Sequence, residues 1–308
     1  MLNVTPFMFH DVRDCSDSRY MRRYNLRSFL TVKQFVDQLK YIMGRYKIIS
    51  SKQLYNIHEE TIEGECAVLT FDDGLLDHYA NVFPILKYYN VSGTFLVAAK
   101  PAIEDYIIHS HKIQFILSCV ENEEVLVERL FDKLNLDSFE RASLWEKYSV
   151  SNFKDNWWTK EMIFVTNFLR YHAESRYSVV NELFNEFVTK DNKAFNEFLY
   201  MKTEHIEKII KSDMIVGGHG YTSENLLSLN DEERYEDITK SLDFVKCFST
   251  DGFISFSYPN GSYNHKVIDN IKTQGCNVAY TTKECVIGQE DLIDYLCLPR
   301  FNSLRKNE

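Results

Sequence analysis

Apolar and polar residues alternate in blocks along the first hundred residues of the chain. Four apolar runs have the length of buried strands: residues 4–9, 47–50, 67–71 and 94–98. Amphipathic segments with apolar residues at helical spacing lie between them, one after Thr31 and one after Gly74. Strands that alternate with single helices predict parallel βαβ units.

The pattern changes over residues 101–202, where amphipathic segments follow one another without a convincing strand. Four of them predict helices: residues 112–120, 124–134, 160–171 and 179–188. The alternation then resumes, with helices predicted near 203–211, 231–248 and 266–274 and strands near 214–216, 253–257 and 278–281. We therefore predict a single α/β domain over residues 1–308 that contains a helical insertion at 101–202, with its site at the C-terminal ends of strands.

Composition narrows the class of partner. The chain of 308 residues has a formal net charge of −10, which argues against nucleic acid or an anionic membrane surface as the main partner. Its seven cysteines include no Cys-x-x-Cys pair, as expected for reduced thiols. No apolar stretch is long enough to span a bilayer, and no basic leader precedes the short apolar run at the N-terminus. We therefore expect a cytoplasmic protein.

Two adjacent carboxylates, Asp72 and Asp73, end the third apolar run and precede Gly74. Like charges at the mouth of a buried strand cost free energy unless a cation lies between them or one carboxylate holds a proton. A bound metal, with one carboxylate as ligand and the other as base, meets this requirement. The alternative is that Asp73 only caps a helix that begins near Leu75.

The segment Thr70–Gly74, with the sequence TFDDG, and the FPILKYY and GTFLV segments after it resemble the first motif of the NodB-homology polysaccharide deacetylases, carbohydrate esterase family four. The resemblance extends over residues 1–100 and 203–301 but not over the helical middle. It implies a distorted (β/α) barrel and a metal-dependent hydrolase that removes an N-acetyl group from an amino sugar. It also implies that Asp72 is the general base and that Asp73 binds the metal. We expect zinc, with nickel, cobalt and iron as alternatives.

The second family motif is His-Ser/Thr-x-x-His, and its two histidines complete the ligand set. In this chain His219 matches the first histidine, whereas Ser223 stands in place of the second. Because a neutral hydroxyl is a poorer ligand than imidazole, three alternatives follow: a weakly held metal with additional water, a substitute ligand, or no metal. The available substitutes are His10, His78, His109, His111 and Glu224.

The third family motif is Arg-x-Pro-Tyr, with a variant that resembles Tyr-Pro-Tyr-Gly in exopolysaccharide deacetylases. This chain has Phe256–Gly261, with the sequence FSYPNG, in which Asn260 takes the place of the motif's tyrosine. In the family a backbone N–H at this point helps to hold the oxyanion, which assigns that role to the turn of Tyr258 and Asn260. The alternative is an ordinary Pro-Asn-Gly turn.

Two further site residues follow from the same resemblance. The exopolysaccharide subgroup has a Tyr-His-Asp-like stretch on its first strand, which Phe9–Asp11 resembles. His10 is therefore our predicted general acid, with metal ligation as its second role. The terminal Leu298–Arg300 also resembles a family ending, and Arg300 is predicted to orient Asp72 or to lower its pKa by ion pairing, with a surface salt bridge as the alternative.

The substrate is inferred from the family and the expected location. The resemblance implies an N-acetylated sugar, which a cytoplasmic enzyme would meet as a nucleotide-linked or lipid-linked precursor of a surface glycan, such as lipopolysaccharide O-antigen or capsule. Two other functions stay open: hydrolysis of another amide or ester, and binding of a glycan precursor by a site that has lost catalysis. The His109–His111 pair as a substrate or metal contact, and Trp157–Trp158 as a sugar-stacking surface, are weaker hypotheses.

Overall fold

The computed structural model describes residues 2–14, 29–57, 62, 64–150, 158–171, 176–288 and 294–303. The chain divides into two compact units. Among the described residues, unit 1 contains residues 2–14, 29–106 and 196–303, and unit 2 contains the described part of 107–195. The described part of unit 2 lies within the predicted insertion and has narrower bounds than 101–202.

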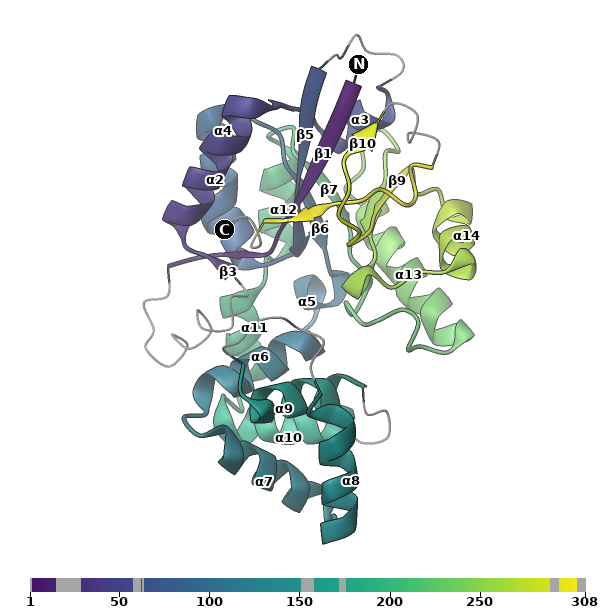
Figure 1. Cartoon of the computed structure of the whole chain (residues 1–308). Helices are drawn as coiled ribbons and strands as arrows, with labels where there is room; N and C mark the ends of the chain where they lie inside the picture. Colours follow the sequence, from purple (N-terminus) through teal and green to yellow (C-terminus); the bar gives the residue numbers. More distant parts are fainter. Residues whose placement is uncertain are drawn as a thin grey trace. The chain divides into compact units, whose positions relative to one another are not determined.

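Unit 1 is built on a curled, half-barrel sheet that has nine strands in the described part of the chain (Figure 1). Its strands are β1 Leu2–Phe9, β4 Lys47–Ile48, β5 Gly64–Asp73, β6 Thr94–Val97, β7 Ile215–Gly218, β8 Ser255–Ser257, β9 Val278–Tyr280, β10 Ile287–Gly288 and β11 Phe301–Asn302. The order is β10-β1-β5-β6-β7-β8-β9, with β4 beside β5 and β11 beside β1. Only the β10 pairing is antiparallel among these strands. The predicted α/β barrel-like fold is confirmed.

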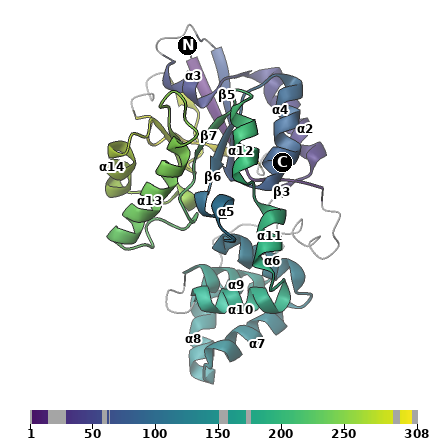
Figure 2. The same cartoon turned by 180° about the vertical axis from the view of Figure 1, so that it is seen from behind.

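Helices and helical turns of unit 1 connect the strands of this sheet. They are α2 Val32–Arg45, α3 Ser51–Tyr55, the π-helical turn η2 His78–Val82, α4 Phe83–Tyr89, α5 Ala99–Ile103, α12 Thr203–Ile210, α13 Asp231–Lys246, the 3-10 turn η3 Pro259–Gly261 and α14 His265–Thr273. A small parallel ladder pairs β2, Asp11–Val12, with β3, Phe29–Leu30. Figure 2 shows α2, α4 and α12 on one side of unit 1 and α13 and α14 on the other.

Local sequence explains where the main helices begin. Thr31 and Gln34 form a reciprocal capping box at the start of α2, as the sequence predicts for Thr31. Asn230 and Glu233 form the same arrangement at the start of α13. The segment after Gly74 differs from the predicted single helix, because a π-helical turn precedes α4.

Alternate residues of β5 face opposite sides of the sheet. Leu69 and Phe71 pack outward in the cluster that includes residues of α2 and α4, whereas Val68 belongs to an inner cluster with Tyr280. Because side chains alternate along a strand, Thr70 and Asp72 continue the inner face. The strand runs through Asp73, and Asp77 takes the N-cap position of η2. Asp73 therefore belongs to the strand and does not hold the N-cap position of the helical segment that follows Leu75.

The C-terminal segment connects the two edges of the sheet. The Leu298 N–H donates to the Ala279 carbonyl beside β9, at 2.9 Å, and Phe301 then pairs with Phe7 of β1. Arg300 lies between these two contacts. The fold thereby brings a residue from the end of the chain against the inner face of β5.

Unit 2 consists of helices in its described residues. They are α6 His109–Cys119, α7 Glu123–Leu134, α8 Ser138–Tyr148, α9 Lys160–Tyr171 and α10 Arg176–Phe187, followed by α11 Asn192–Leu199, which continues into unit 1. Four of these match predicted helices, whereas α8 and α11 were not predicted. Buried aromatic rings of Phe131, Phe164 and Phe168 pack together in its core. Trp157 lies outside the described residues.

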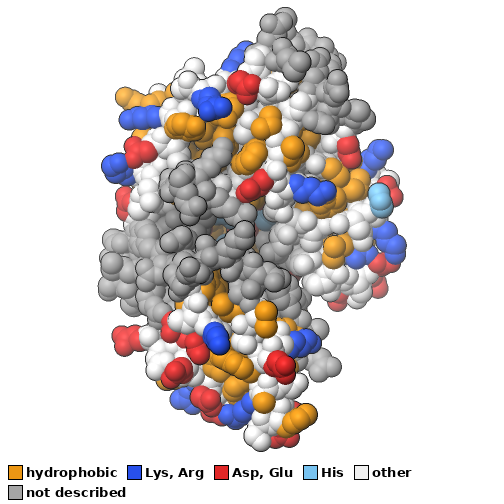
Figure 3. All heavy atoms as spheres, in the orientation of Figure 1, with side chains coloured by type: hydrophobic (Ala, Val, Ile, Leu, Met, Phe, Trp, Pro, Cys, Tyr) orange, Lys and Arg blue, Asp and Glu red, His pale blue; other side chains and the backbone are white. Residues whose placement is uncertain are grey.

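The described surface has a mixed charge. Figure 3 shows acidic and basic side chains interspersed over one face. No helix in the described residues combines the length and the apolar character that a membrane crossing requires.

Candidate functional site

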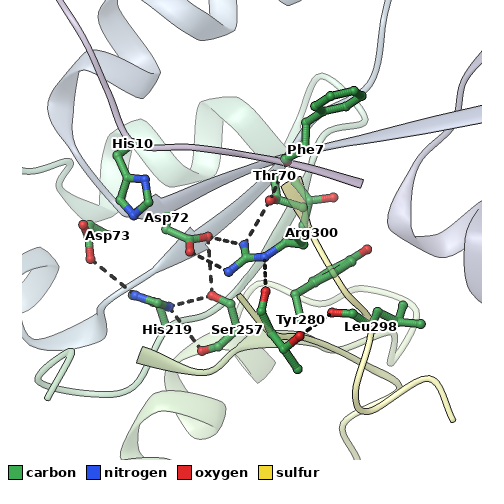
Figure 4. Close-up of polar contacts among 12 residues, drawn as sticks. Phe7, His10, Thr70, Asp72, Asp73, His219, Ser257, Tyr280, Leu298 and Arg300 are labelled. Atoms are coloured by element: carbon green, nitrogen blue, oxygen red, sulfur yellow. Dashed lines mark hydrogen bonds and ion pairs between the residues drawn. The ribbon is translucent and has the colours of Figure 1, made fainter. Parts of the chain in front are cut away.

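Asp72 and Arg300 form a fully buried ion pair on the inner face of the sheet (Figure 4). The two guanidinium nitrogens Nη1 and Nη2 donate to Oδ1 and Oδ2 of Asp72, at 2.7 and 2.8 Å. Arg300 also donates to the hydroxyl of Thr70 and to the carbonyl of Thr281, each at 3.0 Å. Two of these four bonds align the carboxylate, and the other two hold the guanidinium. The burial of both side chains excludes the alternative of a surface salt bridge.

The electrostatics of Asp72 follow from this burial. Desolvation raises the pKa of the Asp72 carboxyl, but Arg300, His219 and His10 together outweigh it, so the pKa lies below its ordinary value. The carboxylate is therefore ionised at neutral pH. It is also a weak base, because the same partners that keep it charged oppose its protonation.

Asp73 and His219 form a second pair beside the first. Asp73 ends β5 with a positive φ of 77°, and His219 follows β7, where its N–H donates to the Val97 carbonyl. The imidazole Nε2 lies 3.4 Å from Oδ1 of Asp73. A positive φ is uncommon for a residue other than glycine, and such conformations concentrate at functional sites.

The tautomer of His219 can be assigned from its other nitrogen. Nδ1 lies 3.2 Å from the carbonyl oxygen of Ser257 and 2.6 Å from its hydroxyl oxygen. Because a carbonyl only accepts, Nδ1 carries a proton. In the neutral ring, Nε2 then directs a lone pair at the Asp73 carboxylate.

A lone pair that faces a carboxylate is unfavourable unless a proton or a metal cation lies between them. Two ligands at about 2.1 Å from a tetrahedral ion are about 3.4 Å apart, which is the spacing of Asp73 Oδ1 and His219 Nε2. Ser223 supplies a third oxygen: its hydroxyl is 3.2 Å from the same Asp73 atom, with a φ of 57°. The residues therefore fit a divalent cation, with two strong donors and a weak third.

The predicted substitute ligands do not complete this set. Within the described residues no three His, Cys, Asp or Glu side chains are grouped closely enough to hold a metal. His78 is buried, and its Nε2 bonds to the carbonyl of His10 at 3.0 Å. His109 lies in unit 2, where its Nε2 bonds to the Leu169 carbonyl.

Asp237 of α13 holds the loop that connects His219 with Ser223. Its carboxylate accepts from the N–H groups of Tyr221 and Thr222, at 2.8 and 3.0 Å, and from the Thr222 hydroxyl at 2.5 Å. Gly220 has a φ of 70°, and a Cβ there would lie 2.9 Å from the Asp237 carboxylate. The loop is therefore fixed by one buried carboxylate.

The segment that carries His10 is held by the π-helical turn η2. The His78 ring bonds to the His10 carbonyl, and the amide of Asn81 donates to the Val12 carbonyl at 2.7 Å. Arg13 forms an ion pair with Asp77 at 2.6 Å. Figure 4 shows the His10 ring beside Asp72, Asp73 and His219. π-Helical turns of this kind are often found at functional sites.

Tyr258 and Asn260 occupy different environments. The N–H of Tyr258 donates to the Tyr280 carbonyl at 3.1 Å, and its buried hydroxyl donates to the Leu296 carbonyl at 2.8 Å. Both donor groups of Tyr258 are therefore used in hydrogen bonds to backbone carbonyls of unit 1. Asn260 is exposed and has a left-handed conformation, with a φ of 56°.

The sequence comparison decides the family. The profile described as polysaccharide deacetylase matches residues 59–133 and 172–279, which is more than half of the chain. The chain belongs to the polysaccharide deacetylase family. The match includes Asp72, Asp73 and His219, whereas His10 and Arg300 lie outside it.

The bounds of the family match differ from the extent of the motif resemblance. It starts at residue 59 and enters the helical middle on both sides, whereas the motifs suggested residues 1–100 and 203–301. A search of curated proteins finds no match.

Solved structures of deacetylases share the fold. The Streptococcus pyogenes deacetylase PplD in complex with acetate superposes with a TM-score of 0.58 at 14% identity, covering 97% of this chain and 92% of that one. IcaB from Ammonifex degensii gives 0.57 at 16%, with 98% and 93% covered. A de-N-acetylase from Aggregatibacter actinomycetemcomitans gives 0.54 at 13%, with 97% and 94% covered.

Two polar residues of this deacetylase-family site were missed in the sequence. Ser257 directly precedes the Tyr258 turn, so its position in the FSYPNG segment was the available signal. Asp237 lies on the buried stripe of α13 beside Ile238 and Leu242. A carboxylate on an apolar helix face is a signal of a buried polar contact, although nothing local identifies its partners.

Proposed function

We propose that this chain removes the acetyl group from the nitrogen of an N-acetylated amino sugar, with a divalent cation as cofactor. The observation that best supports this function is the juxtaposition of two pairs at the end of β5: Asp72 with Arg300, and Asp73 with His219. The first pair keeps a carboxylate ionised at the site. The second offers a cation two strong donors.

Amide hydrolysis needs a base, a stabilised oxyanion and a proton donor, and residues of unit 1 can supply each. Asp72 takes the proton of the attacking water. The backbone N–H of Asn260 donates to the oxyanion. His10 then protonates the departing amine nitrogen. When bound by Asp73 and His219, a cation, for which we favour zinc, supplies charge that polarises the acetyl carbonyl and favours ionisation of water.

Arg300 acts on this chemistry through Asp72. Its two-point contact aligns the carboxylate with respect to the water and keeps it deprotonated. Because the pKa of Asp72 is lowered, the proton transfer is favourable only if the water is itself activated. Proton transfer to Asp72 thus depends on the proposed cofactor.

A metal analysis combined with an acetate-release assay tests this function. The protein is purified without chelators, its zinc, nickel, cobalt and iron are quantified, and it is incubated with N-acetylated sugars. We expect near-stoichiometric metal and release of free acetate. Metal that is strongly substoichiometric, together with no acetate from any substrate, would contradict the proposal.

Ser223 favours a second candidate function, binding of a glycan without catalysis. A hydroxyl in the place of a ligating histidine weakens the hold on the cation. Saturable binding of an N-acetylated sugar without acetate release would support this alternative.

The class of substrate is tested with the same assay. We propose a nucleotide-linked or lipid-linked precursor of a surface glycan, and we compare UDP-N-acetylglucosamine with chitin oligosaccharides. A higher kcat/KM for the nucleotide sugar supports the precursor. Preference for the oligosaccharide would indicate that the enzyme acts on finished polymers instead.

A further inference from the structure

Ser257 lies between the two pairs of the proposed site. It ends β8, is fully buried, and contacts a residue of each pair. Its hydroxyl oxygen is 2.6 Å from Nδ1 of His219 and 3.5 Å from Oδ1 of Asp72 (Figure 4). We propose that Ser257 is a positioning residue that joins His219 to Asp72 through one directed chain of hydrogen bonds.

The direction of this chain follows from the donor inventory. Nδ1 of His219 carries a proton, because it also lies 3.2 Å from the Ser257 carbonyl, which only accepts. The Ser257 oxygen therefore accepts from Nδ1, and its own proton is directed to Asp72, which is ionised. The order is His219 Nδ1–H to Ser257 Oγ–H to Asp72 Oδ1.

The two bonds of the chain are unequal. The contact with His219 has the length of a strong hydrogen bond, whereas the contact with Asp72 is at the long limit. Asp72 Oδ1 already accepts from Arg300 at 2.7 Å. Ser257 thus acts chiefly on His219: its carbonyl fixes the tautomer that leaves Nε2 free to bind a cation, and its hydroxyl holds the ring in place, as outer hydrogen-bond partners do for metal-binding histidines.

The effect of Ser257 on catalysis rests on the proposed function. Its hydrogen bond with His219 can be measured independently. In protein labelled with ¹⁵N-histidine, the Hδ1 resonance of His219 is assigned and its exchange with water is measured at alkaline pH. In Ser257→Ala we expect an upfield shift of Hδ1 and faster exchange. Zinc affinity and kcat/KM are expected to fall about 10- to 100-fold, as is usual for outer partners of metal ligands.

Two variants separate this role from general packing. Ser257→Thr keeps a hydroxyl and is expected to restore the Hδ1 shift and most of the zinc affinity. Ser255→Ala removes a buried hydroxyl from the same strand that has no hydrogen-bond partner in the described residues, so it should leave Hδ1 unchanged.

An Hδ1 resonance that is the same in Ser257→Ala and the wild type would overturn the inference, whatever the activity. A shifted Hδ1 and weaker zinc binding, with no acetate released by the wild type, would support the hydrogen-bond chain and contradict the proposed function instead.

Discussion

Asp72 and Arg300 share a buried ion pair whose removal from water costs several kcal/mol for each charge. Two parallel hydrogen bonds and the contacts of Arg300 with Thr70 and Thr281 offset that cost. An apolar pair of the same volume would serve stability as well. We infer that the charges are present for the chemistry of the carboxylate.

Removing the Arg300 guanidinium should destabilise the folded protein. In Arg300→Met the charge of Asp72 is left buried without its partner, so we expect the free energy of unfolding to fall by about 3–5 kcal/mol. Urea denaturation followed by circular dichroism measures it. Arg45→Met, which changes an exposed arginine of the same unit, should change stability by less than about 0.5 kcal/mol. Equal losses in both variants would show that the ion pair has no special role.

Ser223 limits the affinity of the proposed site for a cation. Histidine is among the residues that tolerate a positive φ, so it can replace Ser223 at 57°. In Ser223→His a second imidazole joins Asp73 and His219, and zinc affinity should rise at least about tenfold, or 1.4 kcal/mol. Calorimetric titration measures the affinity. An unchanged affinity would mean that this side chain does not face the cation.

At the level of elements, the site depends on contacts between segments far apart in the chain. The loop from His219 to Ser223 is fixed by Asp237 of α13, and the segment after β1 is fixed by η2. The positions of the proposed site residues therefore depend on a helix and a π-helical turn that contribute no catalytic group.

Loss of the Asp237 carboxylate should loosen the loop. In Asp237→Ala two backbone N–H groups and the Thr222 hydroxyl lose their acceptor, and we expect a loss of about 3 kcal/mol of stability together with weaker zinc binding. Asp243→Ala, an exposed carboxylate on the same helix, is the control and should stay within about 0.5 kcal/mol. Zinc affinity unaffected by Asp237→Ala would contradict the role of this contact.

Strong periodicity made much of the fold predictable. The helices α9 and α13 lie close to their predicted bounds, and α2 begins after Thr31 as predicted, because each has an apolar stripe that tertiary packing covers. The five-residue helices α3 and α5 were missed, since they are too short to show a period. The π-helical turn was missed for a different reason, because its backbone pattern leaves no mark in the sequence.

The site was predictable where its residues belong to local motifs. Asp72, Asp73 and His219 come together at the C-terminal ends of β5 and β7, as predicted for parallel strands. The contacts of Ser257 and Asp237 were not predicted, because they join residues whose separation in sequence carries no information about distance. Only the fold shows which hydroxyl or carboxylate they reach.

For the whole molecule, His78 links stability to pH. Burial lowers the pKa of this imidazole from 6.5 to about 4. Between these values the unfolded chain binds a proton that the folded protein does not. Stability from His78 is therefore complete above pH 6.5 and is lost as the pH falls toward 4, by about 3 kcal/mol in total.

The His78→Gln variant removes this titration. We expect its free energy of unfolding to depend less steeply on pH than that of the wild type in this window, whereas His265→Gln, at an exposed position, should follow the wild type. Urea denaturation at neutral and mildly acidic pH measures the difference. Parallel curves for wild type and His78→Gln would contradict the account of a buried, neutral imidazole.

The central claim is that this family member hydrolyses an N-acetyl group with Asp72 as the base. The most direct measurement is acetate release by the zinc-loaded wild type and by Asp72→Asn, with folding of both checked by circular dichroism. The account predicts release by the wild type and a kcat lower by about 10²- to 10⁴-fold in the variant. Acetate release that survives Asp72→Asn at the wild-type rate would contradict it.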